Sequence, residues 1–352
     1  MNMKEIQILP AFTVDQVQDG SGWRLVTPAD PDLYSIGRID TRVPEAPVFI
    51  WQGTEIRARF SGRRIGFRFS GAWGQNFFNV IIDGKIRVLL LTEGGTHDYL
   101  LSGELPDGLH ELILYKRTEG KFSNSIFQGI ILEEMAQLEA KPEPLPLCIE
   151  FYGDSITVGA CNEDAGPDQY NDFSTHNNYR SYGAITARAL SAEYVCIAIS
   201  GVGVCYSWNT LLLGDIYDRL YPDLNSPKFA FSGRIPDIVV LNIGQNDYGY
   251  SVTKDVAFPT DFTEKYVGLI RNIRSLYPDA RIVCAMGGMS AYNDSAELRA
   301  GFTKAVAELQ AADGKIFSLS FTPFTYNHPR VDTHEKMATE LTAFLKKEVL
   351  RK

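Results

Sequence analysis

Cysteine is scarce in this sequence, and its few copies form no recognisable pairs. The 352 residues hold five cysteines, and no two of them make a C-x-x-C pair. An odd count without such pairs argues against a disulfide framework and against a structural zinc site. Cys148, Cys196 and Cys284 lie inside apolar runs, where cysteine behaves as a small hydrophobic residue. We therefore expect no metal.

Long apolar runs and clustered positive charge are also missing. No stretch approaches the ~20 apolar residues that a membrane-spanning helix needs, and the formal net charge is -9. Nucleic acids and anionic membrane surfaces both bind clusters of Lys and Arg. We therefore expect neither nucleic acid nor a membrane as a partner, and a neutral substrate fits this charge better than a polyanion.

The first ten residues lack the continuous apolar segment of a secretory signal, although Lys4 is present. As written, the chain is expected to be cytoplasmic. If a signal was removed, it is expected to be secreted or periplasmic. The sequence leaves both the compartment and the oligomeric state open.

The first part of the chain, residues 1–138, has the pattern of an all-β domain. At 352 residues the chain is long for one domain, so we expect two. Ile56, Ala58 and Phe60 alternate with charged residues, and Asp83-Gly84 stands between two β-rich runs, which is a strong hairpin signal. Short strands at this spacing indicate a β-sandwich or jelly roll.

A proline-rich segment separates this part from the next. Residues 139–146 contain three prolines, at positions 142, 144 and 146. Proline is excluded from helix interiors and from central strands. The segment is therefore predicted to be a short, stiff linker.

Residues 147–352 alternate strand-like and helix-like patterns. We predict strands at 147–152, 194–199, 238–243, 281–286 and 316–319, and helices at 182–190, 262–276, 296–312 and 335–349. The run at 238–243 is fully apolar, as a parallel strand covered on both faces requires. This alternation indicates an α/β domain with a doubly wound parallel sheet.

Four strand ends in this second part carry candidate functional residues. Ser155 follows the first strand, Gly201 the second, Asn246 the third and His328 the last. Because the carboxyl ends of parallel strands share one edge of the sheet, these residues can converge. Taken singly, each also fits a helix cap or a turn. Their joint order favours catalysis.

The chemistry of acyl transfer needs such a set. A serine hydroxyl becomes a good nucleophile when a base takes its proton, and histidine titrates in the right range. The oxyanion that then develops needs aimed donors. The backbone N–H groups of Ser155 and Gly201 and the side-chain amide of Asn246 are suitable donors.

These blocks resemble a known superfamily. Gly153-Asp154-Ser155, Gly201, Gly244-x-Asn246-Asp247 and the late histidine look like the four blocks of the SGNH (GDSL-type) hydrolases. Closer still, the chain resembles the second family of carbohydrate esterases, which join an N-terminal jelly roll to an SGNH domain. The following stretches carry that likeness: 178–190, 200–204, His328-Pro329 with 334–338, and in the first part Ile36-Gly37-Arg38, Trp51-x-Gly53 and Asp83-Gly84.

The resemblance implies an activity and roles for residues. That family removes acetyl groups from plant-polysaccharide sugars and needs no cofactor. Ser155 would be the nucleophile and His328 the base. Gly201, Asn246 and the Ser155 N–H would form the oxyanion hole, and His334 matches a second, non-catalytic histidine of the motif.

One position departs from the superfamily pattern. The superfamily usually has an aspartate two residues before the catalytic histidine, where it orients the ring, and this chain has Tyr326 there. The pair is then a Ser-His dyad, or another acceptor holds the imidazole Nδ1. Asp332 and Glu335 are nearby acids, but beyond Pro329 they are not expected to reach the ring.

The expected partner is an acetylated oligo- or polysaccharide, and the polymer and acetyl position stay open. Trp208 and Tyr248 are candidate substrate contacts, because a pyranose ring packs on an aromatic wall; core packing is the commoner place for tryptophan. Two alternatives are a short-chain lipid or thioester hydrolase on the same scaffold, and a non-catalytic carbohydrate-binding protein whose jelly roll does the binding.

Overall fold

The computed structural model describes residues 12–15, 17, 22–231 and 233–350. It divides into two compact units, Met1–Pro144 and Leu145–Lys352. The division falls within the proline-rich segment 139–146. The expectation about a signal in residues 1–10 lies outside the described residues. Each unit is taken in turn.

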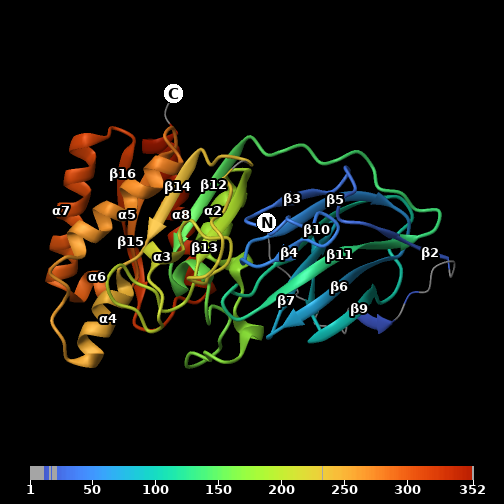
Figure 1. The fold of residues 1–352 in the computed structure, drawn as a ribbon, viewed down its shortest axis with the longest axis horizontal. Helices are drawn as coiled ribbons and strands as arrows, with labels where there is room; N and C mark the ends of the chain where they lie inside the picture. Colours follow the sequence, from blue (N-terminus) through green and yellow to red (C-terminus); the bar gives the residue numbers. More distant parts are fainter. Residues whose placement is uncertain (1–11, 16, 18–21, 232, 351–352) are drawn as a thin grey trace. The chain divides into compact units, whose positions relative to one another are not determined.

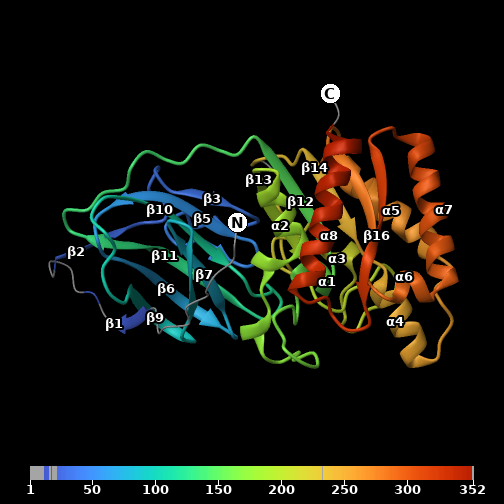
Figure 2. The same ribbon diagram turned by 180° about the vertical axis from the view of Figure 1, so that it is seen from behind.

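The first unit is a sandwich of two antiparallel sheets (Figures 1 and 2). One sheet has the order β1-β9-β6-β11-β2, with β4 also paired to β11, and the other has the order β3-β5-β10-β7-β8. The strands are β1 (Phe12–Asp15), β2 (Trp23–Val26), β3 (Tyr34–Ile36), β4 (Val48–Phe49), β5 (Glu55–Ser61), β6 (Ile65–Trp73), β7 (Phe77–Ile82), β8 (Lys85–Leu90), β9 (Gly94–Leu101), β10 (Leu109–Lys116) and β11 (Asn124–Glu133). The prediction of an all-β domain is confirmed.

The alternating side chains of β5 build the core of this sandwich. Ile56, Ala58 and Phe60 are buried between the sheets, as the period-two pattern predicts. The hairpin between β7 and β8 turns at Asp83 and Gly84, with φ angles of 50° and 75°. Two positive φ angles in succession are typical of a type I′ turn, whose twist matches that of the two strands it joins.

Strand β9 was not predicted. It begins Gly94-Gly95 and then carries polar residues, so it shows no apolar alternation at its start. Its Asp98 is buried and forms an ion pair with Arg68 on β6, with Oδ1 and Nε 2.6 Å apart. In the sequence, a charged residue such as Asp98 argues against a buried strand. In the fold, the ion pair with Arg68 offsets the cost of burying it.

The second unit is built on one parallel sheet with the order β13-β12-β14-β15-β16. Its strands are β12 (Leu147–Gly153), β13 (Ala192–Ala198), β14 (Ile238–Asn242), β15 (Arg281–Met289) and β16 (Ile316–Thr325). The strand order reverses between β12 and β14. In open α/β sheets, ligands bind at the carboxyl ends of the strands beside such a switch point.

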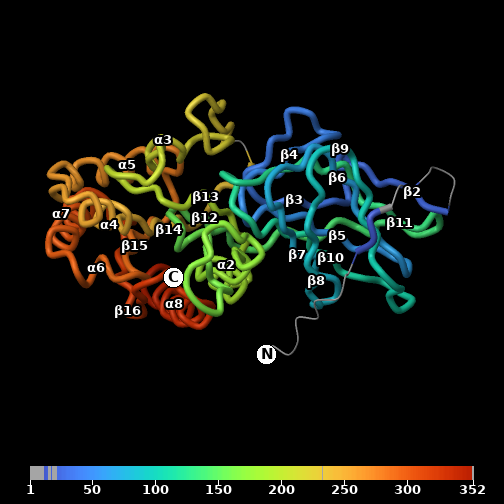
Figure 3. Tube along the Cα trace, turned by 90° about the horizontal axis from the view of Figure 1, so that it is seen from below, coloured from blue at the N-terminus to red at the C-terminus, as the bar shows by residue number. Residues whose placement is uncertain are grey.

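Helices cover this sheet on both faces, which confirms the doubly wound prediction. Helices α2 and α8 pack against each other, as do α5 and α7, and Figure 3 shows α2 and α8 across the sheet from α5. The helices are α1 (Ser155–Val158), η1 (Phe173–Thr175), η2 (Asn178–Arg180), α2 (Tyr182–Ala189), α3 (Leu213–Ile216), α4 (Gln245–Lys254), α5 (Phe262–Leu276), α6 (Ala291–Asp294), α7 (Ala296–Ala312), α8 (Val331–Phe344) and the π-helical turn η3 (Leu345–Val349). Within the described residues, no helix has the length and apolar character that crossing a membrane requires.

Several predicted elements have different bounds, and two of them differ by four residues or more at one end. Strand β16 runs to Thr325 instead of 319. The prediction stopped short because alternate side chains of this edge strand are exposed, so its second half shows no continuous apolar run. The last helix begins at Val331 instead of 335. Helix α4 was not predicted as a helix, since Gly249 interrupts a segment with few apolar residues.

Candidate active site

Ser155 lies on a sharp turn between β12 and α1. Gly153 ends the strand, and a Cβ there would meet Thr157 Oγ1 and the Asn242 carbonyl oxygen, so only glycine fits. Asp154 is the cap of the helix, because its Oδ1 accepts the Ile156 N–H at 3.0 Å. The capping role that Ser155 also fitted is therefore held by its neighbour. The serine hydroxyl is left for another partner.

That partner is His328, on the segment that follows β16. Its Nε2 lies 2.8 Å from Ser155 Oγ, although 173 positions separate the two residues. His328 is 9% exposed and Ser155 is 5% exposed. The distance is within direct hydrogen-bond reach, which is the geometric requirement for a serine and its general base.

Asn246 links the strand ends that carry Ser155 and Gly201. Its Nδ2 donates to Asp154 Oδ2 at 3.2 Å and to the Val202 carbonyl at 2.8 Å. Gly201 has a φ of 84°, and its carbonyl accepts the Trp208 N–H at 2.9 Å. The three expected oxyanion donors thus lie on one connected set of loops.

Asp247 holds the loop after Gly201 in place. Its carboxylate accepts the backbone N–H groups of Val204 (2.9 Å), Cys205 (2.6 Å) and Tyr206 (2.9 Å). Gly203 lies against it so closely that a Cβ would come within 2.5 Å of Asp247 Oδ2. Together with the contacts of Asp154 to Ile156 and Asn246, these hydrogen bonds show that both carboxylates tie loops of the site together.

The Nδ1 atom of His328 has a carboxylate partner that the sequence did not predict. Asp168 Oδ2 lies 2.8 Å from His328 Nδ1. Tyr326, which occupies the usual aspartate position, is 76% exposed. Of the two possibilities that the sequence left open, another acceptor on Nδ1 is the one observed. The only sequence signal was the number of acids in the loop after Ser155, Glu163, Asp164, Asp168 and Asp172, and nothing in their spacing singles out one of them.

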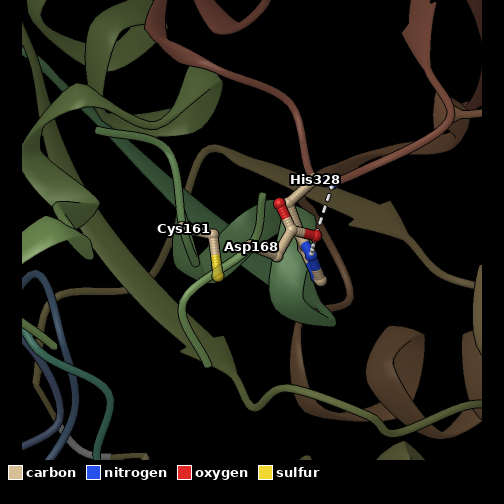
Figure 4. A group of neighbouring side chains, drawn as sticks. All are labelled: Cys161, Asp168 and His328. Carbon is tan, nitrogen blue, oxygen red and sulfur yellow. Dashed lines mark hydrogen bonds and ion pairs between the residues drawn. The ribbon is translucent and has the colours of Figure 1, made fainter. Parts of the chain in front are cut away.

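Cys161, Asp168 and His328 also bring three potential metal-ligand atoms within 4.8 Å of one another (Figure 4). The chemistry of the set does not favour a cation. Asp168 and His328 already bind each other, and the Arg330 guanidinium lies 2.7 Å from Asp168 Oδ1, where it would repel a metal ion. Burial raises the pKa of the Cys161 thiol to about 12, so it stays protonated and is a poor ligand.

The candidate substrate aromatics lie next to the same loops. Trp208 is 46% exposed, and its Cβ is 3.2 Å from where a Cβ of Gly201 would stand. Its ring packs on Tyr250, with centroids 5.3 Å apart, and Tyr250 packs on Tyr206 at 5.1 Å. Tyr248 is half-buried on α4. Trp208 is therefore an exposed ring beside the site, and is not a core residue.

His334 is buried one helical turn into α8. Its Nδ1 accepts the Tyr182 N–H at 3.2 Å, and its ring stacks on that of Tyr182 at an interplanar angle of 5°. Burial lowers the pKa of His334 to about 3. The imidazole is therefore neutral in the folded protein and holds α2 to α8.

His334→Asn is expected to make the free energy of unfolding less dependent on pH. The pKa of this histidine is lower in the folded state than in the unfolded state, so its contribution to stability is present above about pH 6.5 and is lost as the pH falls toward about 3. The loss relative to the Asn variant, which keeps an acceptor but does not titrate, is at most about 1.4 kcal/mol per pH unit. Urea unfolding of both proteins between pH 4 and 8 measures it. A constant difference across that range would contradict a neutral buried histidine.

Known proteins resemble both units of this chain in sequence and in fold. Residues 35–142 match the family model described as Carbohydrate esterase 2 N-terminal, and residues 151–339 match the GDSL-like Lipase/Acylhydrolase family. A solved structure of a family two carbohydrate esterase from Clostridium thermocellum in complex with cellohexaose is 32% identical, with a TM-score of 0.82. The match covers 90% of this chain and 98% of that one. The chain belongs to the family 2 carbohydrate esterases.

The relatives of this family 2 carbohydrate esterase differ in how much of their own length the chain covers. Cellulase/esterase CelE of Acetivibrio thermocellus is 33% identical over 90% of this chain, which spans 39% of that protein. An acetylxylan esterase / glucomannan deacetylase of Cellvibrio japonicus is 26% identical, and the match covers 86% of each protein. The structure of a family two carbohydrate esterase from Cellvibrio japonicus has a TM-score of 0.80 at 23% identity, which supports the fold. The family resemblance drawn from the sequence is confirmed.

Proposed function

We propose that this chain is an O-acetylesterase that removes acetyl groups from plant-polysaccharide sugars of the xylan, mannan or glucan type. The observation that carries the proposal is the 2.8 Å contact between Ser155 Oγ and His328 Nε2 at the switch point of the sheet. The names of the Cellvibrio relatives, acetylxylan esterase / glucomannan deacetylase, support the same substrate class.

In the proposed reaction, Ser155 Oγ attacks the acetyl carbonyl carbon while His328 Nε2 takes the hydroxyl proton. The Ser155 and Gly201 N–H groups and the Asn246 amide stabilise the oxyanion, for which Asn246 exchanges one of its present acceptors. The intermediate collapses as His328 returns the proton to the sugar oxygen, which leaves as a hydroxyl. Water, activated by the same imidazole, then releases acetate from the acetyl-serine. The reaction needs no cofactor.

We propose Trp208 as the wall on which the sugar ring packs, with Tyr248 as a second contact. The exposed ring of Trp208 beside Gly201 supports this role, because a sugar whose acetyl oxygen occupies the oxyanion hole would pass next to it. Tyr248 follows two residues after Asn246 on α4, at the same edge of the sheet. The apolar face of a pyranose gains contact area on such rings.

The proposal is tested with a substrate series. Acetate release from acetylated xylan and acetylated glucomannan, and cleavage of 4-nitrophenyl acetate against 4-nitrophenyl octanoate, are measured with the purified protein. We expect kcat/KM for the acetate to exceed that for the octanoate by at least about 10-fold. The reason is that each extra methylene contributes ~0.8 kcal/mol of binding only when it is buried against apolar groups, and the loop beside His328 offers the polar groups of Asp168 and Tyr170.

Three outcomes would overturn the proposal in different ways. An equal or greater rate with octanoate would favour the short-chain lipid or thioester hydrolase. Binding of unacetylated glucan or mannan with no ester cleavage would favour a carbohydrate-binding protein. Acetyl cleavage from 4-nitrophenyl acetate alone, without release from either polymer, would leave the esterase chemistry and remove the proposed substrate class.

A further inference from the structure

We propose that Asp168 is the positioning residue of the active site and that Arg330 locks it in place, so that the third member of a catalytic triad comes from the loop after the nucleophile. The inference rests on the proposed esterase function. The aspartate that usually precedes the histidine by two residues is replaced here by Tyr326, whose side chain is largely exposed. Here Asp168, which lies 160 positions before His328, makes the contact to the ring.

Asp168 holds His328 at two points with one oxygen. Its Oδ2 lies 2.8 Å from the ring Nδ1 and also accepts the backbone N–H of His328 at 3.1 Å. Since a carboxylate only accepts, Nδ1 carries the hydrogen and Nε2 is left with a lone pair toward Ser155 Oγ. That is the tautomer in which the imidazole takes the serine proton. The carboxylate therefore fixes both the orientation of the ring and the position of its proton.

Arg330 fastens the loop to the histidine segment. Its guanidinium donates to Asp168 Oδ1 at 2.7 Å and to the carbonyl oxygens of Cys161 (2.9 Å), Gly166 and His328 (3.0 Å). Three of these acceptors belong to the loop after Ser155 and one to the segment that carries the base. A lysine in its place could not present donors in this planar arrangement. Arg330 thus connects Asp168 and its loop to the segment that carries His328.

The electrostatics suit a carboxylate that stays charged. Burial acts to raise the pKa of Asp168, but the hydrogen bonds from His328 and Arg330 outweigh it and hold the pKa well below its usual range. The Tyr170 hydroxyl also donates to Oδ2, at 3.2 Å, and its ring lies edge-on to the imidazole with centroids 5.6 Å apart. The side chain of Asp168 is 6% exposed, so water screens little of its charge. A fixed negative charge here stabilises the imidazolium that forms when Ser155 loses its proton.

The decisive variant is Asp168→Asn, which keeps the shape of the side chain and removes the charge. We expect kcat for 4-nitrophenyl acetate to fall on the order of 10²–10⁴-fold, as for the equivalent change in serine proteases, with KM unchanged within about 3-fold, because Asp168 does not reach the acetyl group. The acidic limb of the kcat/KM profile should move to lower pH, since the imidazolium that forms loses its carboxylate partner. The other titratable or charged groups around the imidazole stay the same: Arg330, Tyr170, Cys161, Asp154, His176 and His334.

The matched control is Asp172→Asn on the same loop. Asp172 is exposed and caps η1, with its Oδ1 accepting from Ser174, and it is expected to leave kcat and the pH profile unchanged. Arg330→Lys keeps the charge and is expected to give an intermediate loss of kcat. If Asp168→Asn is folded by near-UV circular dichroism and keeps more than a third of the wild-type kcat with an unmoved acidic limb, the inference is wrong while the esterase function stands.

A spectroscopic measurement separates the inference from the proposed function. An imidazole N–H bound to a carboxylate gives a proton resonance far downfield of the backbone amides. We expect this resonance in the wild-type protein and in Asp172→Asn, and its loss in Asp168→Asn and in His328→Ala. A wild-type protein that shows the resonance but cleaves no ester would remove the function and keep the Asp168–His328 pair. A resonance that persists in Asp168→Asn would overturn the pairing itself.

Discussion

Ser155→Ala is expected to lower kcat for 4-nitrophenyl acetate on the order of 10⁴–10⁶-fold, the range measured when the nucleophile of a serine hydrolase is removed. The hydroxyl that lies 2.8 Å from His328 Nε2 is the only part of the side chain that is lost. Since one oxygen is removed from a turn capped by Asp154, the fold should be kept. Steady-state release of 4-nitrophenol measures the loss, and intact-mass spectrometry checks for the acetyl adduct, which the variant should lack.

Three further variants make this prediction sharper. His328→Ala should cause a loss of similar size, and the double variant should be no worse than either single one, because nucleophile and base act as a unit. Ser275→Ala, at an exposed serine of α5 that bonds the Asn272 carbonyl, is the control and should keep full activity. Turnover by Ser155→Ala near the wild-type rate would place the nucleophile elsewhere.

Asp247→Ala is expected to lower the free energy of unfolding of the second unit by about 3–5 kcal/mol. The carboxylate is fully buried and accepts three backbone N–H groups of the loop after Gly201, which would be left unsatisfied at about 1–3 kcal/mol each. Because that loop carries Gly201, its displacement should also reduce kcat/KM by at least about 10-fold, as small misplacements do in active sites. Urea unfolding and ester cleavage measure the two effects.

Asp247→Asn is the matched variant. Its amide oxygen can still accept the two bonds that now end on Oδ1, from Cys205 and Tyr206, while the amide nitrogen would face the Val204 N–H. We expect it to retain more than half of the stability that the alanine variant loses. Equal losses in both variants would mean that the hydrogen bonds to Oδ1 do not hold the loop.

The residues of this site differ in how far local sequence could predict them. Ser155, Gly201 and Asn246 each come directly after a strand whose apolar run is visible in the sequence, so the parallel sheet itself predicts that they meet. His328 could be placed because few histidines are present and it follows the last strand. Asp168 could not, because it lies among several acids in a loop with no regular pattern. Arg330 pairs with Asp168 and not with the other acids of the loop, and it makes these contacts across about 160 positions of sequence.

The sequence by itself therefore determined the two kinds of domain, the proline-rich segment between them and the strand ends at which the candidate residues Ser155, Gly201, Asn246 and His328 lie. These follow from periodicity and from the rule that parallel strands end at one edge. Only the tertiary structure decided which group stands behind His328, since hydrogen bonds between distant loops leave no periodic trace in the chain. It also decided that Asp154, and not Ser155, caps the first helix, because two adjacent polar residues at a strand end fit that role equally well until their geometry is known.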